Sequence, residues 1–322
     1  MRPRPTTPDA RLENNGSNVA FPRFFDRETT MRWAEGFIAA DWGTTNRRAY
    51  LLNADGDCIG EFEDDKGILS VPKGGFGDAV AEIRRRLGDW PLLLAGMVGS
   101  NRGWVEAPYV SCPAGFEELA ASLVWPEGST AILPGVSFTD EADVMRGEEA
   151  QLLGAYAGGL IPADALVCHP GTHNKWARLR AGRIERFRTV MTGELFNLLR
   201  EHSILADLLG GTAGPGRAFA SGVRCGLSDA CLTSELFKIR ARVLLGQADP
   251  ADAPSYGSGL LIGSDVRAGL REGDDGEIIV MGRPELTRLY SEAVRIAGRQ
   301  CREVDGEQAF LAGAKRIAEL IE

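Results

Sequence analysis

Two short stretches of the chain combine glycine with hydroxyl and charged side chains. They read DWGTTNRR at residues 41–48 and HPGTHNKW at residues 169–176. In the second stretch, His169 and His173 lie four residues apart, a spacing that could hold a metal. Both stretches also contain Gly-Thr, which indicates different chemistry, because glycine lets backbone N–H groups approach an anion and threonine adds a hydroxyl. The second stretch therefore predicts either a metal site or a phosphate-binding turn.

An internal repeat favours the phosphate-binding turn. Residues 38–52 and 166–180 align without a gap. The matched pairs are Gly43 and Gly171, Thr44 and Thr172, Asn46 and Asn174, Ala49 and Ala177, Leu51 and Leu179, with Arg47 opposite Lys175 and Thr45 opposite His173. Each copy continues into an alternating strand and a helical pattern, at residues 77–87 and 193–209. Two hairpins could match by chance, but the repeated order of elements favours a duplicated subdomain.

Two such turns facing each other could hold a polyphosphate, as in a nucleotide, from both sides. The expected phosphate contacts are Gly43, Thr44, Thr45 and Asn46 in the first turn (residues 43–46), and Gly171, Thr172, His173 and Lys175 in or beside the second turn (residues 171–173). His173 has an alternative role, which is to order its own turn through local hydrogen bonds.

Asp41 ends an apolar stretch immediately before the first turn. A buried carboxylate is costly unless it meets a cation or hydrogen-bond donors. Mg²⁺ suits this position, because it binds one or two carboxylates together with phosphates and water. We expect Asp41 to bind Mg²⁺, although capping of its own turn would also explain the residue.

The stretch VMRGEEAQLLGA at residues 144–155 begins a predicted helix with two acidic residues. Phosphoryl transfer to an alcohol needs a base near the acceptor hydroxyl. The stretch resembles the helix start that carries the catalytic Asp of glycerol- and xylulokinase-type enzymes, and by that analogy Glu148 is the base. Glu149 remains the alternative base, and the helix dipole alone would also explain both acids. Arg146 is expected to bind a substrate carboxylate or developing phosphate charge.

A non-periodic loop follows an apolar strand at residues 95–115. Loops at strand ends often carry ligand sites in α/β folds. The expected substrate contacts in this loop are Ser100, Asn101, Arg102, Trp104 and Glu106. Their donors, guanidinium and flat apolar ring suit a small, polyhydroxylated acid, while a structural loop with Trp104 buried is the alternative.

Bulk properties restrict the class of protein. A chain of 322 residues predicts two domains, which we place at 36–160 and 161–322 after a disordered extension at 1–35. The formal net charge of −9 argues against nucleic-acid binding. No apolar run approaches the ~20 residues that span a bilayer, and six scattered cysteines suggest free thiols, so we expect a cytoplasmic protein without membrane contact.

Six motifs in order between Phe37 and Gly263 together resemble the 2-dehydro-3-deoxygalactonokinase family. They are DWGTTNRRAYLL, GMVGSNRGWVEAPYVSCPA, VMRGEEAQLLGA, PGTHNKW, FRTVMTGELFNLLREHSIL and SGLLIG. The resemblance implies an α/β fold of two actin-like (ribonuclease H-like) ATPase domains, with duplicated three-stranded hairpin units around a central cleft. It also implies Mg²⁺- and ATP-dependent phosphorylation of 2-dehydro-3-deoxy-D-galactonate at its 6-hydroxyl, in bacterial galactonate or galactose catabolism. A homodimer is compatible with it.

The chain departs from this family at two places. The family usually has an apolar residue at position 169, which disfavours a metal on His169. Residues 278–290 resemble the family's adenosine-binding stretch, so Gly282 is an expected nucleotide contact, but Arg283 and Pro284 stand where the family often has a small hydroxyl residue. A kinase for another 2-keto-3-deoxy sugar acid is the alternative function, followed by a non-kinase ATPase or polyphosphate hydrolase of the same fold.

Overall fold

A computed structural model describes residues 33–228, 230–272 and 275–321 of the chain. Most of the expected N-terminal extension therefore lies outside the described residues. Its predicted end at residue 35 is wrong, because Trp33 is buried and packs against Phe37 and Trp125, with ring centroids 5.7 and 6.0 Å away. The folded part of the chain thus begins before the first strand.

Two large sheets share one topology, which confirms the predicted duplication. The N-terminal sheet has the order β3-β2-β1-β4-β7-β6, and the C-terminal sheet has the order β12-β11-β10-β13-β14. In each sheet, the first three strands in sequence form an antiparallel unit. The first strand of that unit also pairs in parallel with a later strand on its other side, β4 in the N-terminal sheet and β13 in the C-terminal sheet. The strand bounds are β1 Gly36–Trp42, β2 Arg47–Asn53, β3 Cys58–Asp64, β4 Leu92–Gly96, β6 Val124–Glu127, β7 Thr130–Ile132, β10 Ala165–His169, β11 Asn174–Arg180, β12 Arg183–Val190, β13 Ile278–Gly282 and β14 Cys301–Asp305. A small third sheet contains β5 Tyr109–Ser111, β8 Gly135–Phe138 and β9 Asp143–Met145.

The ungapped alignment of the two hairpins is wrong by one residue beyond the turn. Asp41 pairs with Arg48 across six residues (42–47), whereas His169 pairs with Lys175 across only five (170–174). A slip of one residue moves every side chain of a strand to the other face. Lys175 therefore corresponds to Arg48, and not to Arg47 as the alignment predicts.

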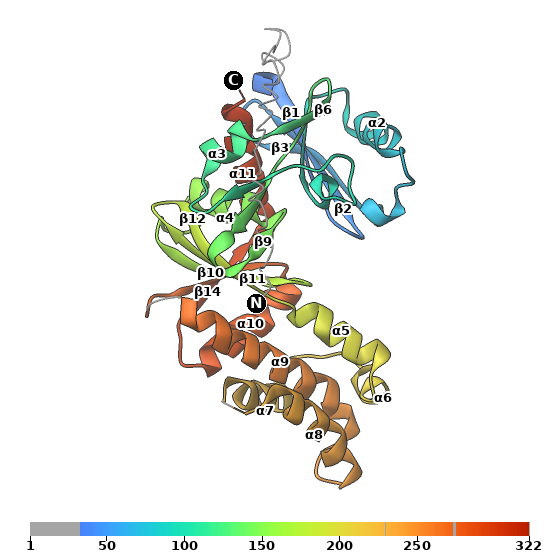
Figure 1. Cartoon of the computed structure of the whole chain (residues 1–322), viewed down its shortest axis with the longest axis vertical. Coiled ribbons are helices and arrows are strands. Elements are labelled where there is room, and N and C mark those ends of the chain that lie inside the picture. The colour runs from blue at the N-terminus through green and yellow to red at the C-terminus, as the bar shows by residue number, and fades with distance from the viewer. Residues whose placement is uncertain (1–32, 229, 273–274, 322) are drawn as a thin grey trace, which may run out of the picture.

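Two helices lie between the large sheets. They are α4 (Glu148–Ala157) and α11 (Gly306–Glu319), and their apolar side chains share one core with the inner faces of both sheets. Figure 1 shows α11 running from the C-terminal sheet up into the N-terminal part of the molecule. There Tyr50 Oη donates to Glu307 Oε2 over 3.0 Å.

Glycines bring α4 and α11 into backbone contact. A Cβ added to Gly154 would lie 2.0 Å from the carbonyl oxygen of Ala309, and one added to Gly313 would lie 2.1 Å from that of Ala150. Only glycine fits at such a close crossing. The two helices therefore pack without intervening side chains.

Other helices cover the outer faces (Figure 1). Helix α2 packs on the N-terminal sheet, while α7, α9 and α10 pack on the C-terminal sheet, and α5, α6 and α8 form a smaller cluster with α9. Their bounds are α2 Phe76–Leu87, α3 Phe116–Ala121, α5 Thr192–His202, α6 Ala206–Leu209, α7 Arg217–Leu227, α8 Leu232–Leu244, α9 Ala253–Gly269 and α10 Pro284–Ile296. Short 3-10 turns lie at η1 Ile68–Ser70, η2 Met97–Gly99, η3 Thr139–Glu141, η4 Pro250–Asp252 and η5 Leu270–Glu272.

The six cysteines are free thiols, as predicted. Among the described residues, no helix has both the length and the apolar character that crossing a membrane requires.

Candidate active site

A polar cavity of about 360 Å³ lies beside the carboxyl end of β1. Its lining residues are Asp41, Gly43, Thr44, Thr45, Asn46, Arg48 and Arg283. The structure thus brings the predicted metal ligand and the whole first turn together. It adds two arginines that the sequence analysis did not place there, one of them from the far end of the chain.

Asp41 is a partly buried carboxylate that lines this cavity. Burial raises its pKa, the nearby Arg48 lowers it, and Glu148 raises it again. These influences mean that Asp41 and Glu148, although 107 positions apart in sequence, are close enough to interact electrostatically. A cation at this place would offset the cost of burying Asp41.

The backbone after β3 covers the first turn. Gly67 N donates to Thr45 O over 2.9 Å, and Ile68 N donates to Gly43 O over 3.0 Å. A Cβ on Gly67 would lie 2.3 Å from both Thr44 O and Thr45 N. This glycine, which the sequence analysis did not single out, therefore fixes the path of the first turn.

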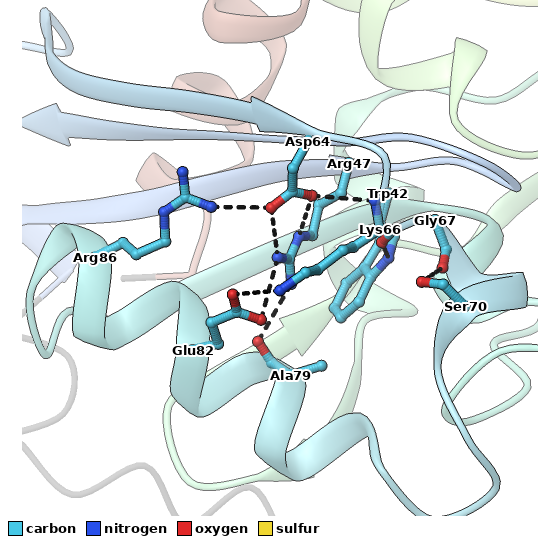
Figure 2. Close-up of polar contacts among 9 residues, drawn as sticks. All are labelled: Trp42, Arg47, Asp64, Lys66, Gly67, Ser70, Ala79, Glu82 and Arg86. Carbon is cyan, nitrogen blue, oxygen red and sulfur yellow. Dashed lines mark hydrogen bonds and ion pairs between the residues drawn. The ribbon is translucent and has the colours of Figure 1, made fainter.

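A buried arginine holds that covering segment (Figure 2). Arg47 is fully buried, and its Nη2 and Nε donate to the two carboxylate oxygens of Asp64 over 2.8 and 3.2 Å. On the same side of the sheet, Trp42 Nε1 donates to Lys66 O over 2.9 Å. Arg47 points away from the cavity, so it supports the first turn from the opposite face of the sheet.

The glycine amides of both turns are engaged within their own turns. Gly43 N donates to Asn46 O over 2.9 Å, and Gly171 N donates to the side-chain oxygen of Asn174 over 2.7 Å. Each of these two N–H groups therefore closes its turn, and the role of Gly43 and Gly171 in phosphate binding stays a prediction. The exposed residues that follow, Thr44 and Thr172, remain open to a ligand.

A buried polar network fixes the second turn. Asn174 Nδ2 contacts Asp265 and Tyr290, and Asp265 also accepts hydrogen bonds from Thr192, Tyr290 and Trp176 over 2.6, 2.6 and 2.8 Å. Burial raises the pKa of Asp265, and these hydrogen bonds oppose the rise. Asp265, which stands in none of the sequence motifs, joins α9 to Asn174 beside the second turn.

The second turn also packs against the start of α5. A Cβ on Gly193 would lie 2.4 Å from Gly171 O, so Gly193 covers this turn as Gly67 covers the first. His173 Nε2 pairs with Glu194. This contact is the local, turn-ordering role that was the alternative for His173.

The two acids that begin α4 have different environments. Both carboxylate oxygens of Glu149 accept from Gly147 N, at 2.8 and 2.7 Å, and burial together with Glu148 raises its pKa to about 8. Glu148 is partly exposed, and its Oε1 lies 3.5 Å from Nζ of Lys175 on the opposite sheet. Of the two carboxylates, only that of Glu148 is accessible to solvent, because Glu149 is fully buried.

The loop at 97–108 does not line the cavity, and two of its expected substrate contacts are structural. Ser100 is buried, and its Oγ donates to Met97 O over 2.7 Å. Trp104 stacks on Phe76 with ring centroids 6.4 Å apart and packs against the core under α2. The remaining three, Asn101, Arg102 and Glu106, are exposed.

Arg146 lies beneath this loop and is 9% exposed. Its Nη2 donates to Ala107 O over 2.8 Å, and its guanidinium lies 4.3 Å from the centroid of the Tyr109 ring. Nε and Nη1 have no hydrogen-bond partner among the described residues. The loop therefore covers the Arg146 side chain, which was expected to bind a substrate carboxylate or developing phosphate charge.

Neither His169 nor Gly282 lines the cavity. His169 Nε2 bonds to Gln151 Oε1 over 2.8 Å, and burial lowers its pKa. Gly282 ends β13 with a φ of 150°, and a Cβ there would lie 3.6 Å from Pro170 O, beside the second turn. Gly282 is therefore close to the second turn, as a nucleotide contact requires.

Comparisons with known proteins agree on one family. A family model described as 2-keto-3-deoxy-galactonokinase matches residues 41–317. The 2-dehydro-3-deoxygalactonokinase of Escherichia coli (strain K12) is 37% identical over 294 residues, covering 88% of this chain and 98% of that protein. A crystal structure of a protein from Sinorhizobium meliloti has 35% identity and a TM-score of 0.83, covering 88% of this chain and 99% of that one.

A more distant structure supports the fold alone. Component A of the (R)-2-hydroxyglutaryl-CoA dehydratase from Acidaminococcus fermentans has 11% identity and a TM-score of 0.51, covering 89% of this chain and 99% of that one. The two sheets of equal topology are those of the actin-like ATPase fold, as the sequence predicted.

Proposed function

Because the chain belongs to the 2-keto-3-deoxy-galactonokinase family, we propose that it transfers the terminal phosphoryl group of ATP to the 6-hydroxyl of 2-dehydro-3-deoxy-D-galactonate. One observation within the structure carries this proposal. Asp41 and the first turn lie at one cavity, and Glu148 lies near enough to shift the pKa of Asp41. A kinase needs these groups together, namely a phosphate site, a carboxylate for the metal and a base.

The nucleotide phosphates are proposed to lie between the two turns. The exposed residues Thr44, Thr45 and Asn46 offer hydroxyl, amide and backbone donors on one side, and Thr172 offers its hydroxyl on the other. Gly282, beside the second turn, is the proposed contact of the nucleoside part. Gly43 and Gly171 shape their turns, because their amides are already bonded.

Asp41 fits a divalent cation. Its partly buried carboxylate lines a cavity with several oxygen-bearing neighbours, which is the donor set that Mg²⁺ prefers. When bound there with ATP, Mg²⁺ would neutralise phosphate charge during transfer. The protein's part is to hold one carboxylate in a fixed place.

Glu148 is the proposed general base. It is the partly exposed acid of the pair, whereas Glu149 is fully buried and bonded to Gly147. Lys175 on the C-terminal sheet pairs with Glu148 over 3.5 Å, and its ammonium group is the proposed contact of the transferred phosphoryl group. Asn101, Arg102 and Glu106 remain the proposed contacts of the sugar acid.

The proposal is tested by measuring ADP release with MgATP in a coupled assay. The acceptors are 2-dehydro-3-deoxy-D-galactonate, its C4 epimer and no acceptor. We expect ADP release that depends on the sugar acid, with kcat/KM for the galacto form about tenfold or more above that for the epimer. ADP release that ignores the sugar acid would overturn the kinase assignment, and equal kcat/KM for both epimers would overturn the named substrate.

A further inference from the structure

An ion pair joins the two halves of the chain at the cavity. Nη2 of Arg283, the residue before α10, lies 2.9 Å from Oε1 of Glu63 on β3. The same carboxylate oxygen accepts from Nε of Arg48 over 3.3 Å. One glutamate thus holds two arginines that line the cavity.

This ion pair is poorly explained as a stabilising contact. The side chains of Glu63 and Arg283 are 49% and 53% exposed. Exposed ion pairs contribute little to folding because water screens them and because two long side chains must be ordered. Burial acts to raise the pKa of Glu63, but Arg48 and Arg283 together lower it, so the glutamate is ionised at neutral pH.

The position of Arg283 suggests what the pair does. Its backbone follows Gly282, which lies beside the second turn, while its side chain reaches across to the cavity at the first turn. Pro284 begins α10 and fixes the backbone at this point. Arg283 is therefore a cation from the C-terminal sheet aimed at the proposed phosphate site of the N-terminal sheet.

We propose that Arg283 is a phosphate-binding residue for the nucleoside triphosphate, and that Glu63 occupies its guanidinium until the nucleotide arrives. This inference rests on the proposed function, because it assumes that the cavity receives phosphates. A polyphosphate carries more negative charge than one carboxylate and offers several oxygens to a guanidinium fork. The nucleotide therefore displaces Glu63 and takes over Arg283, with a lower apparent affinity than if Arg283 were free.

The test measures nucleotide affinity by titration calorimetry, with MgATP, MgADP and adenosine, in the absence of any sugar acid. The variants are Glu63→Gln, Arg283→Gln and the double variant. The matched control is Glu277→Gln, because Glu277, just before β13, and Arg302 on β14 form an ion pair of similar length and exposure, 3.0 Å with 45% and 41% exposed. Kinase activity is not used, so failure of the proposed acceptor would leave this result interpretable.

Glu63→Gln is expected to tighten MgATP binding by about 2- to 5-fold, the range of an exposed ion pair. Arg283→Gln is expected to weaken it about tenfold, while the affinity for adenosine is unchanged. In the Arg283→Gln background the gain from Glu63→Gln should shrink, since only the contacts of Glu63 with Arg48 and Asn46 remain to be released. The control variant should match the wild type.

Three results would overturn the proposal. The first is weaker MgATP binding in Glu63→Gln, which would make the ion pair a clamp that supports the bound state. The second is an equal loss of MgATP and adenosine affinity in Arg283→Gln. The third is a gain from Glu63→Gln that keeps its full size without Arg283, which would assign the effect to Arg48.

Discussion

Gly67→Ala is the sharpest test of how the first turn is held. The backbone of Gly67 has φ −65° and ψ 175°, which alanine adopts without strain. The added Cβ would however lie 2.3 Å from Thr44 O and Thr45 N, whereas ordinary contact begins at 3.4 Å. The first turn must therefore move by about 1 Å. A displacement of that size at a catalytic site costs about 10²-fold in rate.

The expected kcat/KM for ATP is about 10²-fold below wild type. Overpacking should also lower the free energy of unfolding by about 1–3 kcal/mol, and the melting temperature should fall with it. Steady-state kinetics in the coupled ADP assay and thermal denaturation measure the two effects. Gly77→Ala is the control, because a Cβ on this residue of α2 meets nothing within 4 Å. It should keep full activity and gain about 0.5–1 kcal/mol from helix propensity.

The reasoning is refuted if Gly67→Ala keeps kcat/KM within about threefold of wild type while folding normally. It is also refuted if the loss appears only in the KM for the sugar acid, while kcat and nucleotide affinity stay unchanged. In either case the first turn would tolerate the displacement, or would not contact phosphate.

Three further predictions concern the carboxylates of the site. Glu148→Gln should lower kcat by about 10²–10⁴ in the coupled assay with little change in nucleotide affinity, and near-normal turnover would exclude it as the base. Asp41→Asn should lose activity that high Mg²⁺ restores in part, and an unchanged Mg²⁺ dependence would argue against a metal role. Folded Glu149 keeps its proton up to a pKa of about 8, while the unfolded chain releases it near 4.5, so unfolding free energy falls as pH rises between these values. In Glu149→Gln that fall should be shallower by up to about 1.4 kcal/mol per pH unit in denaturation series at pH 5 to 8, and an unchanged slope would contradict the buried position.

Local chemistry was predictable where neighbours in sequence are neighbours in space. Asp41 and the first turn follow directly from an apolar strand that ends in a carboxylate and a Gly-Thr pair, and the structure places them at one cavity. The repeat of Gly171 and Thr172 predicted a second sheet of equal topology. These features depend on a few consecutive residues, so the sequence pattern contained them.

Contacts across the chain were not predictable in the same way. Arg283 and Glu63 are 220 residues apart, and no periodicity relates them. Asp265 follows an apolar run in α9, and one acid in a helix gives no sign that it bonds to Asn174 beside the second turn. The register at Lys175 was missed because a turn shorter by one residue leaves no mark in an ungapped alignment.

The close crossing of α4 and α11 has a consequence for synthesis on the ribosome. Helix α11 is made after every other element that the structure describes, yet it supplies Ala309, Phe310 and Gly313 to the packing against α4 and the N-terminal sheet. Domains generally fold as they emerge, N-terminal part first. Here α4, which begins at Glu148, cannot pack against α11 until residues 306–319 leave the exit tunnel. Until then, one apolar face of the N-terminal sheet stays exposed to solvent. A nascent chain stalled before residue 306 should therefore be a chaperone substrate, and should be cut readily by protease near α4.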